Sequence, residues 1–144
     1  MAIAFVAATS AAAASNELTS TATITITDAT DMVVAYGSGL NLPSGITFDS
    51  TGTPAAMTSA VTAQSAVGEA SVGIFYILDA NLPGAGTYTI QGTWGTTGNV
   101  AVVGGVALSG VTQATPGGTG SNFSSAASSA ILTVTVAKLL MTGW

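Results

Sequence analysis

One segment of this chain alternates apolar and polar residues with a period of two. Residues 19–27 read TSTATITIT. Ala22, Ile24 and Ile26 fall on one side of an extended chain, and the intervening threonines fall on the other. Successive side chains of a β-strand point to opposite faces, whereas a helix groups residues three and four apart. The segment therefore predicts a half-buried strand with one apolar face and one solvated face.

The rest of the chain carries similar signals, separated by turns at intervals of about 8–12 residues. About nine short strands are predicted, at residues 2–8, 19–27, 32–36, 45–48, 57–63, 70–78, 87–94, 100–108 and 131–137. No segment predicts a stable helix. The turn at 49–54 contains Gly52, which we expect to supply a positive φ. We therefore expect an all-β protein, a single antiparallel β-sandwich that is jelly-roll-like and spans residues 1–144 as one domain.

Two adjacent glycines interrupt the predicted strand at 100–108. Gly104 and Gly105 remove two successive side chains, which predicts either a β-bulge or a close approach of another part of the chain. Aromatic residues at strand positions are expected to pack in the core. These are Tyr36, Phe75, Tyr76, Tyr88 and Trp94.

The chain carries very little charge, and this excludes several kinds of function. Lysine and arginine total 1, aspartate and glutamate total 6, and histidine and cysteine are absent. A single cation cannot neutralise a row of phosphates, which excludes nucleic-acid binding by charge. Without histidine or cysteine, the common zinc sites, Ser-His-Asp triads and thiolate nucleophiles are also excluded. We predict a protein that is not an enzyme and uses no cofactor.

Low charge combined with high hydrophobicity also argues against two other classes of protein. The hydrophobic fraction is 48%, whereas disordered chains combine low hydrophobicity with high net charge. No stretch of about 18 uninterrupted apolar residues is present, so we predict no membrane-spanning helix. A globular domain with a surface of Ser, Thr, Gly and Ala has little charge repulsion to keep copies apart, which favours an assembled or extracellular protein.

The two ends of the chain are the candidate interaction segments. Residues 2–8 predict an N-terminal strand arm, and a secretory signal is the alternative, although no basic residue precedes the apolar run. Residues 138–144 form an apolar tail, which we expect to be anchored either in the protein's own core or on a neighbouring subunit. The candidate interface residues are Phe5, Leu139, Leu140, Met141 and Trp144.

The acidic residues are interpreted as solvated turn residues. Their spacing defines no carboxylate pair of the kind that a glycosidase requires. Asp28 and Asp31 can supply calcium ligands, but the chain lacks the D-x-D-x-D-G loop of a calcium site, and we predict no metal site. Asn122 begins the glycosylation sequon Asn-Phe-Ser, a short pattern with weak specificity.

The order of strand motifs resembles a β-sandwich domain family of bacteriophage virion proteins and of surface or secreted proteins of environmental bacteria. The resemblance spans most of the chain and consists of strand and turn patterns. The residues that carry it are 2–5 (AIAF), 21–27, 32–36, 45–48 (GITF), 56–58, 73–78 (GIFYIL), 86–90 (GTYTI) and 107–116 (ALSGVTQATP).

In size and β-rich composition the chain is also similar to small phage capsid decoration, or cement, proteins. That resemblance implies a structural virion protein on the outer capsid surface, with the major capsid protein as its partner and a homotrimer as its oligomer. It brings no catalytic residues. Two alternatives stay open, namely a secreted or surface adhesion or fibre module that binds glycans, and an extracellular filament built by exchange of the N-terminal strand.

Overall fold

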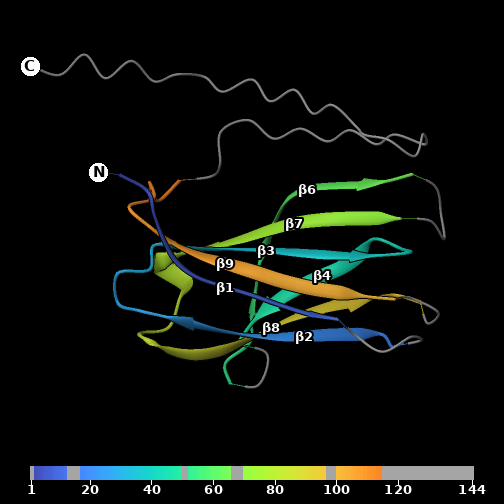
Figure 1. Ribbon diagram of the computed structural model, residues 1–144, viewed down its shortest axis with the longest axis horizontal. Helices are drawn as coiled ribbons and strands as arrows, with labels where there is room; N and C mark the ends of the chain where they lie inside the picture. The colour runs from blue at the N-terminus through green and yellow to red at the C-terminus, as the bar shows by residue number, and fades with distance from the viewer. Residues whose placement is uncertain (1, 13–16, 50–51, 66–69, 97–99, 115–144) are drawn as a thin grey trace, which may run out of the picture.

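The computed structural model describes residues 2–12, 17–49, 52–65, 70–96 and 100–114. These residues form nine β-strands and one short 3-10 helix (Figure 1). The elements are β1 (Ala4–Ala12), β2 (Thr19–Ile26), β3 (Met32–Gly39), β4 (Pro43–Phe48), β5 (Ala55–Ala56), β6 (Thr58–Gln64), β7 (Ser71–Leu78), η1 (Asp79–Asn81), β8 (Gly86–Trp94) and β9 (Val102–Ser109).

The strands form two sheets that pack face to face, which confirms the predicted antiparallel β-sandwich. The larger sheet has the order β1-β9-β3-β7-β6, and the smaller has the order β2-β8-β4-β5. Every neighbouring pair is antiparallel. Figure 1 shows β6, β7, β3, β9 and β1 succeeding one another across the molecule, with β2 and β8 beneath them.

The pairing pattern is that of a jelly roll. Strand β1 pairs with β9, β2 with β8, β3 with β7 and β4 with β5, as in one long hairpin whose tip lies at β4 and β5. Successive strands from β1 to β4 alternate between the two sheets, and so do β7, β8 and β9. This rolled hairpin brings both ends of the described chain together at one sheet edge. Strand β6 is an addition beside β7.

The core lies between the sheets and follows the predicted alternation. Strand β2 alternates strictly between exposed and buried residues, with Ala22, Ile24 and Ile26 buried as expected. Strands β4 and β8 of the same sheet and strands β3 and β9 of the opposing sheet contribute further fully buried residues. The largest of these are Trp94, Phe48, Ile46, Ile90, Val33 and Val103. Burial of such side chains contributes about 1.5–3 kcal/mol each, so this layer holds the sandwich together.

Most of the aromatic residues pack as expected, but Tyr36 and Tyr76 do not. Phe75 and Trp94 are buried in the core, and the ring of Tyr88 packs against that of Phe48 with centroids 5.5 Å apart. Tyr36 alternates with the buried residues of β3 and therefore faces away from the core. Its predicted core position is wrong, because Val33 and Ala35 occupy the core side of β3. The predicted core position of Tyr76 is also wrong, because Tyr76 lies opposite Val34 and is buried on the outer side of the sheet.

Some strands are longer than predicted, because small residues beyond the predicted end still pair with the neighbouring strand. Strand β1 runs to Ala12 instead of ending at Ala8, because residues 9–12 pair with residues 102–105 of β9. Strand β4 begins at Pro43, with an irregular register between Pro43 and Gly45 that accommodates the missing N–H of proline. The two-residue strand β5 was not predicted, and the predicted strand at 131–137 lies outside the described residues.

The turn after β4 uses a different residue for the left-handed conformation than expected. Asp49 has a φ of 52°, whereas Gly52 has no positive φ. Aspartate tolerates this region because its short side chain can hydrogen-bond locally. Here the Asp49 carboxylate accepts a hydrogen bond from the Thr53 N–H at 2.8 Å. Gly52 is instead required for close approach, since a Cβ there would collide with that carboxylate.

The glycine pair of β9 marks a close approach and not a bulge. Strand β9 keeps a regular register through Gly104 and Gly105 with both β1 and β3. A Cβ on Gly105 would lie 2.5 Å from Cδ1 of Ile90, which reaches it from the smaller sheet. A Cβ on Gly104 would lie 2.6 Å from the ring of Tyr36 on the opposite face. Gly105 therefore makes room for a core side chain, and Gly104 makes room for a side chain on the outer surface.

Gly105→Ala is expected to destabilise the fold by about 1–3 kcal/mol, because the added methyl group overpacks against Ile90. Urea unfolding monitored by tryptophan fluorescence measures this change. Gly45→Ala is the matched control, since a Cβ on Gly45 has no atom within 4 Å. The control is expected to change stability by no more than about 0.5 kcal/mol. Equal losses in the two variants would contradict the close-contact explanation.

Candidate functional site

The side of the five-stranded sheet that faces away from the core forms a continuous surface, called the outer face below. Strand pairing defines it, because residues opposite one another share a face. Val33 and Ala35 of β3 are fully buried, so their neighbours in sequence point outward. Its residues are Phe5, Ala8, Ser10, Met32, Val34, Tyr36, Ser38, Thr58, Val61, Ala63, Val72, Ile74, Tyr76, Leu78, Val102, Gly104, Val106 and Leu108.

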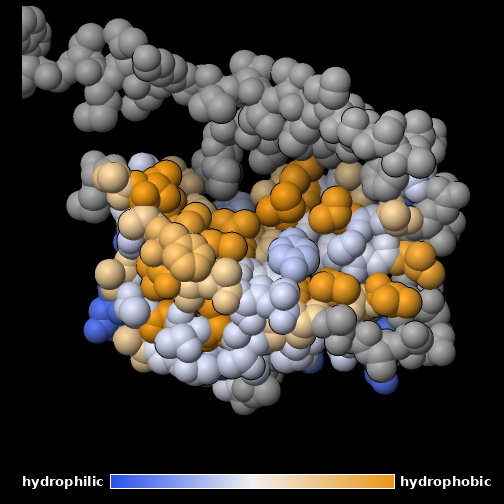
Figure 2. Space-filling model, viewed as in Figure 1, coloured by the Kyte–Doolittle hydropathy of each residue, from blue (hydrophilic) through white to orange (hydrophobic). Residues whose placement is uncertain are grey.

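None of these residues is charged, and most are apolar. An antiparallel sheet that faces water on one side normally alternates apolar and polar residues, as β2 does. The outer face departs from that pattern, and Figure 2 shows apolar side chains gathered on the side where β1 and β9 lie. Contiguous apolar patches of this kind mark interaction surfaces in soluble proteins.

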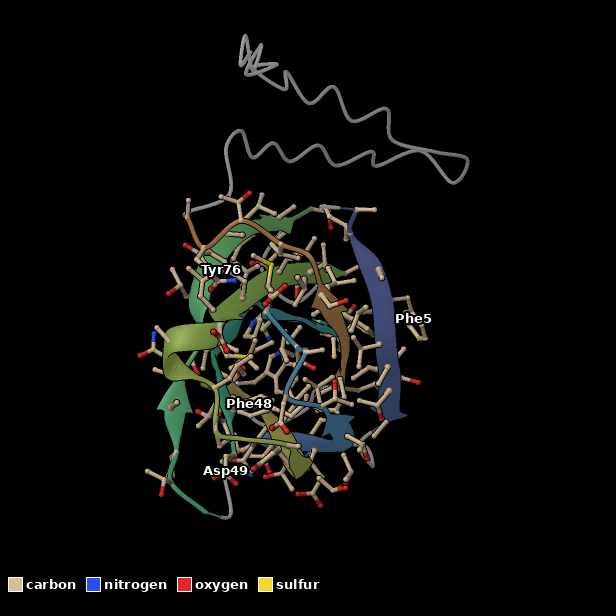
Figure 3. All side chains as sticks on the ribbon, turned by 90° about the vertical axis from the view of Figure 1, so that its left-hand side faces the viewer. Phe5, Phe48, Asp49 and Tyr76 are labelled. Carbon is tan, nitrogen blue, oxygen red and sulfur yellow. The ribbon has the colours of Figure 1, made fainter. Side chains whose placement is uncertain are left out.

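Phe5 is the most prominent side chain of the outer face. It is 68% exposed, and Figure 3 shows its ring projecting away from the sheet. The pairing of β1 with β9 shifts register between Phe5 and Ala7, so Phe5 lies opposite Leu108 while Ala7 packs against the core. The local irregularity therefore directs the ring outward from a strand at the edge of the sheet.

A shallow depression lies on the same face, further along β1 from Phe5. Its volume is about 490 Å³, and its lining comes from β1, β3 and β9. It lies where β9 has no side chain on its outer side at Gly104, and the Tyr36 ring occupies the space that a Cβ there would need. The lining residues are Ala8, Thr9, Ser10, Tyr36, Gly105 and Val106.

One corner of the outer face is closed. Met32 and Tyr76 are each only 7% exposed although they point away from the core. The Gln113 side-chain amide crosses this end, because its nitrogen donates to the Asp31 carbonyl at 2.9 Å and its oxygen accepts from the Asp79 N–H at 3.0 Å. The open part of the face is therefore centred on β1 and β9.

Only one of the predicted interface residues lies in the described part of the chain. Phe5 is exposed on the outer face as described. Leu139, Leu140, Met141 and Trp144 lie outside the described residues, as does the Asn122 sequon. Tyr36 and the depression were not predicted from the sequence, although the alternation of Val33 and Ala35 with their neighbours could have placed Tyr36 on the outer side.

The carboxylates of Asp28 and Asp31 accept hydrogen bonds from backbone N–H groups at turns. The Asp28 carboxylate accepts a hydrogen bond from the Ala85 N–H at 3.0 Å. The Asp31 carboxylate accepts from the N–H groups of Gly110 and Val111, joining the start of β3 to the end of β9. A positive φ of 70° at Gly110 turns the chain there. Within the described residues, no group of three or more potential metal-ligating side chains of these types comes together.

Comparison with known proteins identifies no relative of this chain, since no family model, no curated protein and no solved structure matches it. Within the described residues, no helix has the length and hydrophobicity needed to cross a membrane.

Asp31→Ala is expected to lower the free energy of unfolding by about 1–3 kcal/mol, because two backbone N–H groups lose a charged acceptor. Chemical denaturation measures the loss. Glu17→Ala is the control, because Glu17 is exposed and takes no part in this contact. If both variants unfold at the same urea concentration, Asp31 does not hold the end of β9 to β3.

Proposed function

We propose that this protein is a structural virion protein, a capsid decoration or cement protein that binds the major capsid protein on the outer capsid surface and stabilises the shell as a homo-oligomer. The observation that carries the proposal is the uncharged outer face with exposed Phe5. Such a face has a favourable free energy of burial and no charge to desolvate. Its role is therefore to adhere to another protein surface.

Two further features support a role in assembly. Jelly rolls recur in viral capsid proteins, although they also occur in lectins, so the fold agrees with the proposal without fixing it. A lattice of repeated sites also compensates for weak individual contacts, because many copies engage the same particle. The net charge of −5 disfavours nonspecific association with nucleic acid.

A filament subunit is the second candidate. In the described part of the chain, strand β1 lies at the edge of its sheet and pairs with β9 alone. A strand in this position can be exchanged for the same strand of a neighbouring copy. Deleting residues 1–9 would abolish polymers in that case, whereas it would only weaken the attachment of a decoration protein.

Purified particles are expected to contain this chain in a fixed, high ratio to the major shell protein. Mass spectrometry after density-gradient purification measures the ratio, with chymotrypsin as the protease because the chain has a single Lys or Arg. A few copies per particle would indicate a tail or fibre component. Absence from particles, with the protein free in the medium or on cells, would contradict the virion assignment and favour adhesion or filament roles.

Attachment to the shell is also expected to depend little on salt, because the outer face has no charges to screen. Raising NaCl from 0.1 M to 1 M should change the bound fraction less than about twofold, measured by co-sedimentation with shells. Phe5→Ser should reduce the bound fraction, and Leu18→Ser, which removes an exposed leucine outside the outer face, should not. Steep release by salt would contradict the apolar mode of binding.

A further inference from the structure

We propose that the open edge of β2 is a self-association site, where the β2 strands of two copies pair antiparallel about a two-fold axis at Ala22. The pairing joins the two four-stranded sheets into one sheet that continues from copy to copy. This inference deepens the proposed function, because it rests on the homo-oligomer proposed there and names its contact. It uses an edge of the smaller sheet and leaves the outer face free to bind the shell.

Strand β2 differs from the other strands that end the two sheets. In the described part of the chain these are β1 and β6 in the larger sheet and β5 in the smaller. Folded proteins protect sheet edges with register irregularities, very short strands, charges or proline, because an open edge pairs with other chains. Strands β1 and β6 each contain a register shift, and β5 has only two residues. Strand β2 has eight residues in regular register and contains no charge, glycine or proline, so it is open to a further strand.

The backbone groups on the open side of β2 belong to its threonines. The Trp94 N–H donates to the Leu18 carbonyl at 2.8 Å, so these two residues form a hydrogen-bonded pair between β2 and β8. Such pairs alternate along an antiparallel ladder, and the residues between them direct their N–H and C=O groups away from the partner strand. In β2 these are Thr19, Thr21, Thr23 and Thr25. Within the described residues, no hydrogen bond uses these backbone groups.

Two contacts lie next to this edge without occupying it. The Thr27 N–H donates to Oγ1 of Thr30 at 3.1 Å, which ends the open edge after Thr25. Strand β1 approaches β2 from the core side, where the Ser20 hydroxyl donates to the Ala11 carbonyl at 3.5 Å. Ser20 belongs to the buried residues of β2, whose backbone groups bond to β8. The edge groups of the threonines are therefore left for a partner strand.

One register satisfies the edge groups of both copies. When Ala22 lies opposite Ala22 of the second copy, Thr21 faces Thr23 and Thr19 faces Thr25 across the axis. Each of these residues contributes one N–H and one C=O, so about eight backbone hydrogen bonds join the copies. That number lies within the range usual for specific protein interfaces. An axis at another residue leaves some of these groups unpaired.

The side chains in this register favour a second copy over an unrelated strand. On the solvent side threonine lies opposite threonine, a pairing that stabilises antiparallel strands. The chain already contains such a pair on this face, since Oγ1 of Thr25 and Oγ1 of Thr87 lie 3.0 Å apart. On the core side the small Ala22 faces its own copy. Symmetry alone therefore continues the alternation of β2 across the junction, whereas another strand would need the same pattern in its own sequence.

The charges that flank β2 predict the effect of salt. Glu17 precedes the strand and Asp28 follows it. In the proposed register Glu17 of one copy faces Thr27 of the other, next to Asp28, so like charges approach one another. Raising NaCl from about 0.1 M to about 1 M screens this repulsion and should strengthen the dimer. Weakening of the dimer by salt would contradict the proposed contact.

Sedimentation equilibrium of the purified full-length chain tests the proposal. The mass is expected to rise from 13.9 kDa towards twice that value as the concentration increases from about 1 to 200 μM. The double variant Thr21→Lys/Thr23→Lys should raise the dimer Kd at least about tenfold, because the register sets lysine opposite lysine. Both side chains are exposed, so the fold is expected to persist. Circular dichroism checks that it does.

The double variant Thr47→Lys/Ala56→Lys is the matched control. Thr47 lies opposite Ala56 at the far edge of the same sheet, and it shares the solvent side with Thr21 because both lie opposite Gln91. The control adds the same charge to the same face and should leave the dimer Kd unchanged. If the two double variants weaken the dimer equally, a general charge effect explains the loss and the inference is wrong.

A charge-reversal experiment tests the pairing of the two strands. Thr21→Lys/Thr23→Lys and Thr21→Glu/Thr23→Glu should each be monomeric alone, because like charges lie opposite one another. An equimolar mixture should form a mixed dimer, since each lysine then faces a glutamate of the other copy. Failure of the mixture to associate would overturn the β2 contact.

Disulfide cross-linking tests the register, since the chain contains no cysteine. Ala22→Cys should cross-link under mild oxidation, because directly opposed residues of a non-hydrogen-bonded pair have Cα atoms about 4.5 Å apart, within the range of a disulfide. Ser20→Cys is the control, since Ser20 is equally buried and small. The two Ser20 positions lie about four residues apart along the strands, roughly 13 Å, and should not cross-link. Equal cross-linking of both variants would overturn the register.

The outcomes separate this inference from the proposed function. A monomer at every concentration, or an oligomer whose mass is unaffected by Thr21→Lys/Thr23→Lys, overturns the β2 contact. Neither result bears on whether the chain occupies particles in a fixed ratio. Conversely, a dimer that depends on β2 while the chain is absent from particles supports the inference and removes the virion role.

Discussion

The close approach of the two sheets at Gly105 is the contact on which the architecture depends. Strand β9 lies between β1 and β3, and Ile90 reaches it from the smaller sheet where a side chain would otherwise stand. The adjacent Gly104 has the same effect on the other side, since Tyr36 lies across it. Gly105 therefore leaves the space that the Ile90 side chain fills inside the sandwich, and Gly104 leaves the space that the Tyr36 ring occupies outside it.

The surface divides into regions of different chemistry because strands and turns carry different residues. The central strands β3, β7 and β9 of the larger sheet are mostly apolar on both faces, whereas the turns at one end carry the aspartates. Those aspartates bind backbone N–H groups and so hold the turns in place. The apolar face is of the kind that contacts other proteins, whereas the charge at the acidic end favours solubility.

Sequence patterns predicted the strands well where alternation was strict and poorly where residues were small. The core positions of Ile24 and Ile26 in β2 follow from period two, since every second side chain must be buried or solvated. Residues 9–12 gave no such signal, because alanine and serine fit a loop as readily as a strand. Their conformation depends on β9, a partner almost a hundred residues away.

By itself, the sequence determined the all-β class, the antiparallel sandwich and the absence of histidine and cysteine. It also indicated Phe5 as an interface residue. Only the tertiary structure decided that Tyr36 faces outward, that Gly104 and Gly105 mark a close approach, and that Phe5 and a depression share one face. The physical reason is that alternation specifies which residues share a side, whereas the side that becomes the core depends on the strands that pack against it.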